Sequence, residues 1–169
     1  MADLAAALAA NRAAAAELLA TADRLGAAWS VAPAPGKWSP AQITEHVAVG
    51  HDVSARVVMG TASDVPKLPR FLRPLVRRLA FRKVLDQGRF PRPVRTLKAF
   101  QPLRAPATPA EGRARLEQAI AKFEADVIGW AKGQDRTIEH PAFGAVALSD
   151  YVRYLEIHTR HHQKQFPGG

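Results

Sequence analysis

Three of the six histidines in the sequence fall within five positions near its C-terminus: His158, His161 and His162. Residues four apart lie on the same face of an α-helix, so His158 and His162 can direct both imidazoles at one metal ion. The zinc-peptidase motif HExxH uses this geometry, but Thr159 stands here in place of the glutamate that acts as general base in that motif. A metal site built on this pair therefore needs another ligand from elsewhere in the chain.

A second candidate ligand lies on a helix that the sequence predicts to begin at Ser39. Ser39 is a good N-cap, Pro40 suits the first helical position, and Gln42 completes a capping box. Apolar residues then recur at steps of three and four, and His46 falls on or beside the apolar face about two turns from the start. His46 is therefore positioned on a well-defined helix.

Three further helices are predicted, over residues 3–28, 108–132 and 150–166, the last two beginning at the N-caps Thr108 and Ser149. Abundant alanine and short β-branched runs favour helix throughout. Four helices with one long connection predict an all-α fold, a four-helix bundle with one crossover. The length of 169 residues fits a single domain covering the chain, residues 1–169.

The crossover, about residues 61–107, is rich in proline, which excludes a long regular helix. A short helix over 71–85 is still expected. Its predicted inward residues are apolar and its predicted outward residues are arginines: Leu72, Leu75, Val76 and Leu79 against Arg73, Arg77 and Arg78.

The crossover also carries the charge of the molecule. The chain has a formal net charge of +9, while the stretch from Lys67 to Lys98 holds eleven Lys/Arg residues and one acid, a net +10, so that the remainder is −1. This basic segment could be a solvated face, could contact nucleic acid or an anionic membrane, or could bind the carboxylates of an anionic thiol cofactor or substrate. No nucleic-acid-binding motif accompanies it.

If the second and last helices face each other, His46 meets His158 and His162. Three histidines with an open position are typical of a catalytic divalent site, in which the metal acidifies a bound water or thiol. All-imidazole ligation suits Zn, Ni, Cu or Fe(II) and does not choose among them. The alternative is that these are surface or core histidines that bind no metal.

The remaining candidates are weaker. His51 and His161 point away from the faces that carry the ligands and are expected at the surface. His140, in the turn-forming run His-Pro-Ala-Phe-Gly, could reach the mouth of the site or only serve the turn. Tyr154, one turn before His158, could donate a hydrogen bond to a bound ligand or pack in the core. His140 and Tyr154 are the candidate catalytic residues.

Several classes of protein are excluded. The sequence has no cysteine, so disulfides, thiolate metal sites and a cysteine nucleophile are absent. No Ser-His-Asp arrangement, phosphate-binding loop or dinucleotide fingerprint is present. The N-terminal stretch lacks the basic region of a signal peptide, and no apolar run reaches the ~18 residues that a membrane-spanning helix needs. We therefore expect a soluble, cytoplasmic protein.

Three stretches resemble one family: Trp38-Ser39-Pro40 with Gln42 and Glu45-His46, the run from His140 to Gly144, and the last helix from Ile157 to Gln165. Together they resemble the DinB/YfiT-like superfamily, in particular a bacterial branch with an HPxFG loop and an IHTxHHxxQ last helix. The resemblance covers most of the chain apart from the basic crossover, and the last helix is its most specific part.

The resemblance implies a four-helix bundle in which His46, His158 and His162 bind a divalent metal, most often Zn or Ni. It implies a small-molecule substrate, a homodimer, and a thiol-dependent transferase or isomerase that uses a low-molecular-weight thiol such as bacillithiol, mycothiol or glutathione. We therefore expect a metal-dependent enzyme, a thiol S-transferase or a hydrolase. The alternative is a non-catalytic metal-binding helical protein, or a module that binds a polyanion through the basic crossover.

Overall fold

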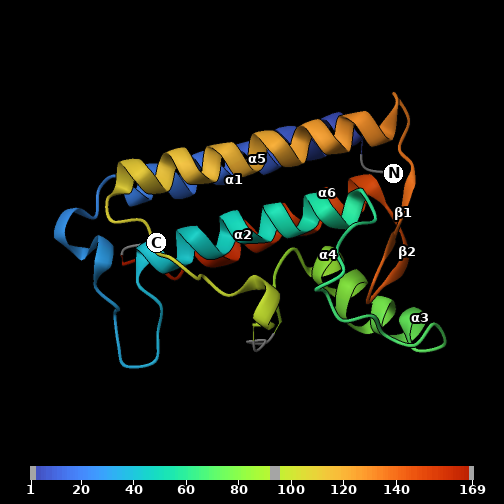
Figure 1. Ribbon diagram of the computed structural model, residues 1–169, viewed down its shortest axis with the longest axis horizontal. Helices are drawn as coiled ribbons and strands as arrows, with labels where there is room; N and C mark the ends of the chain where they lie inside the picture. The colour runs from blue at the N-terminus through green and yellow to red at the C-terminus, as the bar shows by residue number, and fades with distance from the viewer. Residues whose placement is uncertain (1–2, 92–95, 168–169) are drawn as a thin grey trace.

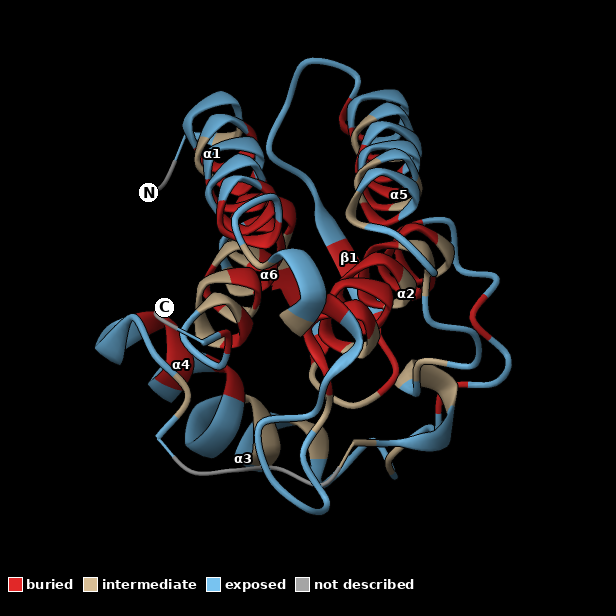
Figure 2. Ribbon diagram, turned by 90° about the vertical axis from the view of Figure 1, so that its left-hand side faces the viewer, coloured by how far each residue is buried: buried red, intermediate tan, exposed pale blue. Residues whose placement is uncertain are grey.

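The computed structural model describes residues 3–91 and 96–167 (Figure 1). Within them, four long helices lie side by side: α1 (Leu4–Ala22), α2 (Pro40–Val58), α5 (Pro109–Ala131) and α6 (Leu148–Gln163). Helix α1 packs along α6 and α2 along α5, and α2 also contacts α6. Their buried sides face one another (Figure 2). In these parts of the chain, no helix is long and apolar enough to cross a membrane.

The predicted start of α2 is confirmed. The side chain of Ser39 accepts a hydrogen bond from the backbone N–H of Gln42, and the side chain of Gln42 accepts one from the backbone N–H of Ser39. Two of the backbone donors left unpaired at the helix start are thereby satisfied, which fixes where α2 begins and hence where His46 lies.

Helix α1 ends earlier than predicted, at Ala22 rather than near residue 28. Gly26 adopts a positive φ of 49° and begins the 3₁₀ helix η1 (Gly26–Ser30). The indole N–H of Trp29 in η1 donates to the carbonyl oxygen of Pro106, which ties this corner to the chain just before α5.

Helix α6 does not begin with Ser149 as its N-cap, contrary to the sequence prediction. Its N-cap is Ala147, which makes no side-chain capping bond. The backbone N–H and the hydroxyl of Ser149 both donate to the carboxylate of Asp135, which precedes the hairpin. Asp135, fourteen residues away in the sequence, therefore accepts hydrogen bonds at the start of the helix that carries two of the candidate ligands.

The protein is mostly helical but also contains a two-stranded antiparallel sheet, which the all-α prediction missed. Strands β1 (Thr137–His140) and β2 (Gly144–Ala147) pair so that His140 lies opposite Gly144. Ile138 and Val146 face each other as a buried pair. The predicted turn after His140 is thus the turn of a β-hairpin.

The crossover contains a continuous helical stretch made of α3 (Arg73–Val76), the π-helical η2 (Arg77–Arg82) and α4 (Lys83–Gln87), followed by the short 3₁₀ helix η3 (Lys98–Phe100). A helix here was predicted, but the face assigned to the core was wrong. The apolar residues Leu72, Leu75 and Leu79 are exposed. The π-turn shifts the phase of the helix, because its hydrogen bonds span five residues instead of four.

A different set of side chains anchors this stretch. Phe81, Val84 and Leu85 are buried instead. The guanidinium of Arg73 donates to the carboxylate of Glu139 in β1, and that of Arg77 donates to the carbonyl oxygen of Ala145 in β2. Two of the three arginines predicted to point into solvent thus hold the stretch to the hairpin, while the third, Arg78, is exposed as predicted.

Candidate metal centre

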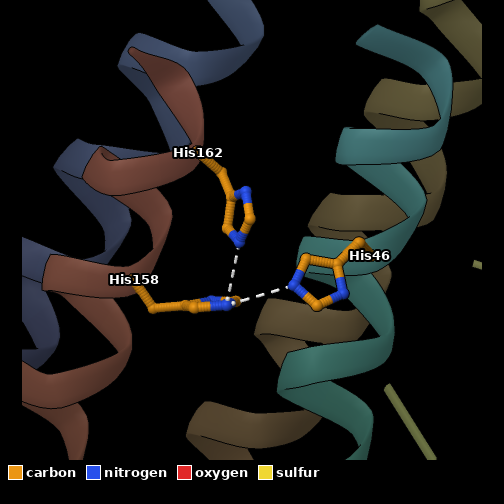
Figure 3. Close-up of side chains that lie close together, drawn as sticks. All are labelled: His46, His158 and His162. Carbon is orange, nitrogen blue, oxygen red and sulfur yellow. Dashed lines mark hydrogen bonds between the residues drawn. The ribbon is translucent and has the colours of Figure 1, made fainter. Parts of the chain in front are cut away.

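Three imidazoles converge between α2 and α6 (Figure 3). His46 comes from α2, and His158 and His162 come from successive turns of α6. The Nε2 atom of His158 lies 3.2 Å from Nε2 of His46 and 3.1 Å from Nε2 of His162. One nitrogen from each of the three residues lies within 4.8 Å of the others. The structure therefore brings together the three residues that the sequence singled out as ligands.

These separations fit a metal ion. With metal–nitrogen bonds of about 2.0–2.1 Å in tetrahedral geometry, neighbouring ligand nitrogens lie about 3.3 Å apart. Two of the three pairs are already close to that value. The donor set consists of imidazoles only, which bind Zn, Ni, Cu or Fe(II).

The ring of His46 is held by a backbone group of the crossover. Its Nδ1 lies 2.6 Å from the carbonyl oxygen of Phe100 in η3. A carbonyl oxygen only accepts, so Nδ1 carries the proton and, in the neutral ring, Nε2 presents its lone pair to the cluster. Trp38 packs against the same ring with a centroid distance of 4.8 Å. Both the tautomer and the orientation of His46 are therefore fixed.

His162 is fixed in the same way by a side chain. Its Nδ1 donates to Oε1 of Gln165 over 3.0 Å, and the amide nitrogen of Gln165 lies 3.2 Å from Nε2 of His161. Partners of this kind set the tautomer of metal-binding histidines and raise their basicity as ligands. The Nε2 lone pair of His162 is thus also directed at the cluster.

The environment keeps the three rings neutral. Burial lowers the pKa of His46, a shift that the bond to Phe100 partly opposes. Burial, followed by the neighbouring His162 and His46, lowers the pKa of His158 well below its ordinary value. Burial and then His46 lower the pKa of His162 to about 3. Because a metal binds the neutral imidazole, the cluster is ready for a cation at neutral pH.

The crossover covers one side of the cluster. The ring of Phe90 packs edge-on against His158 with a centroid distance of 5.8 Å, and against Tyr154 and His161 at 5.3 Å each. Phe100 contributes its carbonyl oxygen to His46. The crossover therefore contacts the site through the ring of Phe90 and the carbonyl oxygen of Phe100, two contacts that the sequence did not predict.

Tyr154 lies next to the cluster in an aromatic group. Its ring stacks on Phe81 at 5.2 Å and contacts Phe90. Burial raises the pKa of its hydroxyl to about 12. Tyr154 is therefore a neutral hydrogen-bond donor at physiological pH, and its catalytic role stays a prediction.

His140 serves the hairpin turn. Its Nδ1 accepts hydrogen bonds from the backbone N–H groups of Ala142 and Phe143, and its ring stacks on Phe143 at 4.3 Å. Burial and then the charge of Arg73 lower its pKa to about 4. These contacts give His140 a structural role in the turn, and the residue lies outside the three-histidine group.

The other two histidines lie outside the three-histidine group, as expected, but both are more buried than predicted. His51 was predicted at the surface but is fully buried, because α2 is covered on nearly every side. Its Nδ1 donates to the carbonyl oxygen of Val47, and its Nε2 faces the side chain of Asn11. His161 is half-buried against Phe90 and lies outside the three-histidine group.

Comparison with known protein families identifies the family to which this chain belongs. The family model of the DinB superfamily matches residues 7–166. The chain therefore belongs to the DinB superfamily. No curated protein and no solved structure matched the chain.

Proposed function

We propose that this protein is a divalent-metal-dependent enzyme with the DinB-like four-helix-bundle fold, and that His46, His158 and His162 hold a Zn or Ni ion. The observation that carries the proposal is the convergence of the three Nε2 atoms, two of which belong to rings whose Nδ1 proton is held by an acceptor. Without a cation, the Nε2 lone pairs of His46 and His162 would both face the Nε2 atom of His158.

A divalent ion held by three imidazoles leaves a coordination position for an outside ligand and lowers the pKa of a thiol or water bound there. The chain supplies the surroundings of that position. Trp38 and Phe90 pack against the ligand rings and exclude water from those sides. Tyr154, which keeps its proton at neutral pH, can donate a hydrogen bond to an anionic ligand.

We propose a small electrophile as the substrate and a low-molecular-weight thiol as the co-reactant. In thiol transfer, the sulfur forms a bond to the electrophilic carbon, the thiol proton goes to solvent, and the leaving group departs with the electron pair. In hydrolysis, a water oxygen takes the place of the sulfur. We propose that the functional molecule is a homodimer, as the family resemblance implies.

The test is a screen with protein reconstituted with Zn or Ni. Several thiols are combined with a chloronitroaromatic, an epoxide and an activated ester, and both thiol consumption and product are measured. We expect turnover that depends on the metal and is lost in His158→Asn. It should be retained in His161→Ala, which changes a neighbouring histidine outside the group. If the reconstituted protein holds its metal yet accelerates none of these reactions, with or without thiol, the enzymatic proposal is refuted and the site is a non-catalytic metal site.

A further inference from the structure

The helical stretch of the crossover presents an apolar face to solvent. Phe71, just before this stretch, is 80% exposed, and Leu75 and Leu79, one turn apart, are 54% and 62% exposed. The stretch lies at the periphery of the molecule (Figures 1 and 2). Large apolar side chains gathered on one exposed face indicate an interaction surface rather than scattered surface residues.

Basic side chains are also exposed along this stretch. Arg70, Arg78 and Lys83 are exposed and make no ion pair with any residue that the structure describes. Arg73 and Arg82, by contrast, are neutralised by Glu139 and Asp150. Arg70 and Arg78 directly precede Phe71 and Leu79 in the sequence and line the space between the stretch and the hairpin, while Lys83 follows one turn after Leu79. The unpaired charges therefore flank the exposed apolar residues, whereas Arg73 ties the stretch to β1 and Arg82 ties it to α6.

We infer that this face, formed by Phe71, Leu75 and Leu79 with Arg70, Arg78 and Lys83, docks on the surface of an anionic membrane. A helix that is apolar on one side and rich in Lys and Arg lies in the interface, with its apolar side chains among the lipid head groups and its basic side chains near the phosphates. Since no described helix can span a bilayer, the contact is peripheral.

Two other partners fit this face less well. A second copy of the chain would bring its own basic segment, which carries a net +10, against this one, and the like charges would repel. A single-stranded nucleic acid would need aromatic rings on which bases stack. Phe71 is the only aromatic residue in this exposed set, and the leucines offer no such ring. A lipid surface uses both the apolar and the basic side chains.

Docking would also place the metal centre near the lipid. Phe81, on the buried side of the same stretch, stacks on Tyr154. The ring of Phe90 contacts both Tyr154 and His158, one of the three histidines of the cluster. The membrane proposal does not depend on the metal, because none of the three ligands belongs to the docking face.

The test is co-sedimentation of the full chain with vesicles of phosphatidylcholine alone or with 30% phosphatidylglycerol, at low and high salt. We expect binding only to the anionic vesicles, weakened by salt. Arg78→Glu with Lys83→Glu, and separately Leu75→Ser with Leu79→Ser, should each weaken binding more than about tenfold. The control is Ile128→Ser, a residue that is 58% exposed on α5, the helix that Figure 1 shows on the opposite side of the molecule from α3 and α4.

Circular dichroism and metal content establish that each variant is folded. Equal binding to neutral vesicles, no binding to anionic ones, or binding that falls as much in Ile128→Ser as in the leucine variant would overturn the proposal. So would a monomer–dimer equilibrium that the leucine variant abolishes while vesicle binding is unchanged, which would assign the face to a second copy. Salt-sensitive binding of single-stranded RNA in preference to vesicles, lost in Phe71→Ala, would assign it to nucleic acid.

Discussion

Replacing Gln165 by leucine should weaken metal binding although Gln165 is not a ligand. Its Oε1 accepts the Nδ1–H of His162 over 3.0 Å and thereby directs the Nε2 lone pair at the cluster. Removing such a partner typically costs 10–100-fold in metal affinity. Gln165 is exposed, so water can replace part of the lost bond, and we expect the lower end of that range. The expected loss is about tenfold, or about 1.4 kcal/mol.

The assay is competition between the protein and a chromophoric chelator for Zn and for Ni at neutral pH. Gln163→Leu is the matched control, since it makes the same change at the last residue of α6, two positions before Gln165, and the structure gives the Gln163 side chain no hydrogen bond among the described residues. Gln165→Glu should bind the metal at least as tightly as the wild type, because a carboxylate accepts the same proton. Equal dissociation constants for Gln165→Leu and Gln163→Leu would refute the reasoning.

Further predictions concern stability. The pKa of His140 is about 4 in the folded chain against 6.5 for a free histidine, so its contribution to stability is complete above pH 6.5 and falls by about 3 kcal/mol as the pH drops to 4. In the metal-free protein, His140→Asn should remove that part of the pH dependence in urea titrations, because the amide oxygen accepts the same N–H groups and does not titrate; parallel curves would contradict this. Gly112→Ala should destabilise by about 1–3 kcal/mol, because a methyl group there would lie 2.7 Å from the ring of Trp29. Gly129→Ala, in the same helix with nothing within 4 Å, should stabilise by about 0.5–1 kcal/mol, and a change of the same sign in both variants would contradict the packing argument.

The three candidate ligands could be predicted from the sequence because their signals are local. The spacing of His158 and His162 needs only a helix, and the start of the helix that carries His46 is set by Ser39 and Gln42. The support of the site could not be predicted in the same way. The acceptor for His46 is the carbonyl oxygen of Phe100, and a backbone carbonyl has no signature in residue type.

The misassigned elements share a physical cause, which is that distant contacts override local patterns. Each strand of the hairpin spans only four residues, and β2 is made of glycine, alanine and one valine. The apolar spacing of Leu75 and Leu79 predicted a buried face, but the π-turn and the burial of Phe81 rotate that face outward. Ser149 carries the residue type of an N-cap, yet it donates to Asp135 instead.

The most direct test of the account is the metal content of the purified protein, measured by elemental analysis after reconstitution with Zn or Ni and desalting at neutral pH. The account predicts one ion per chain in the wild type and in His161→Ala, and none in a folded His158→Ala variant. A wild-type protein that retains no ion, or a His158→Ala variant that retains one as tightly as the wild type, would contradict it.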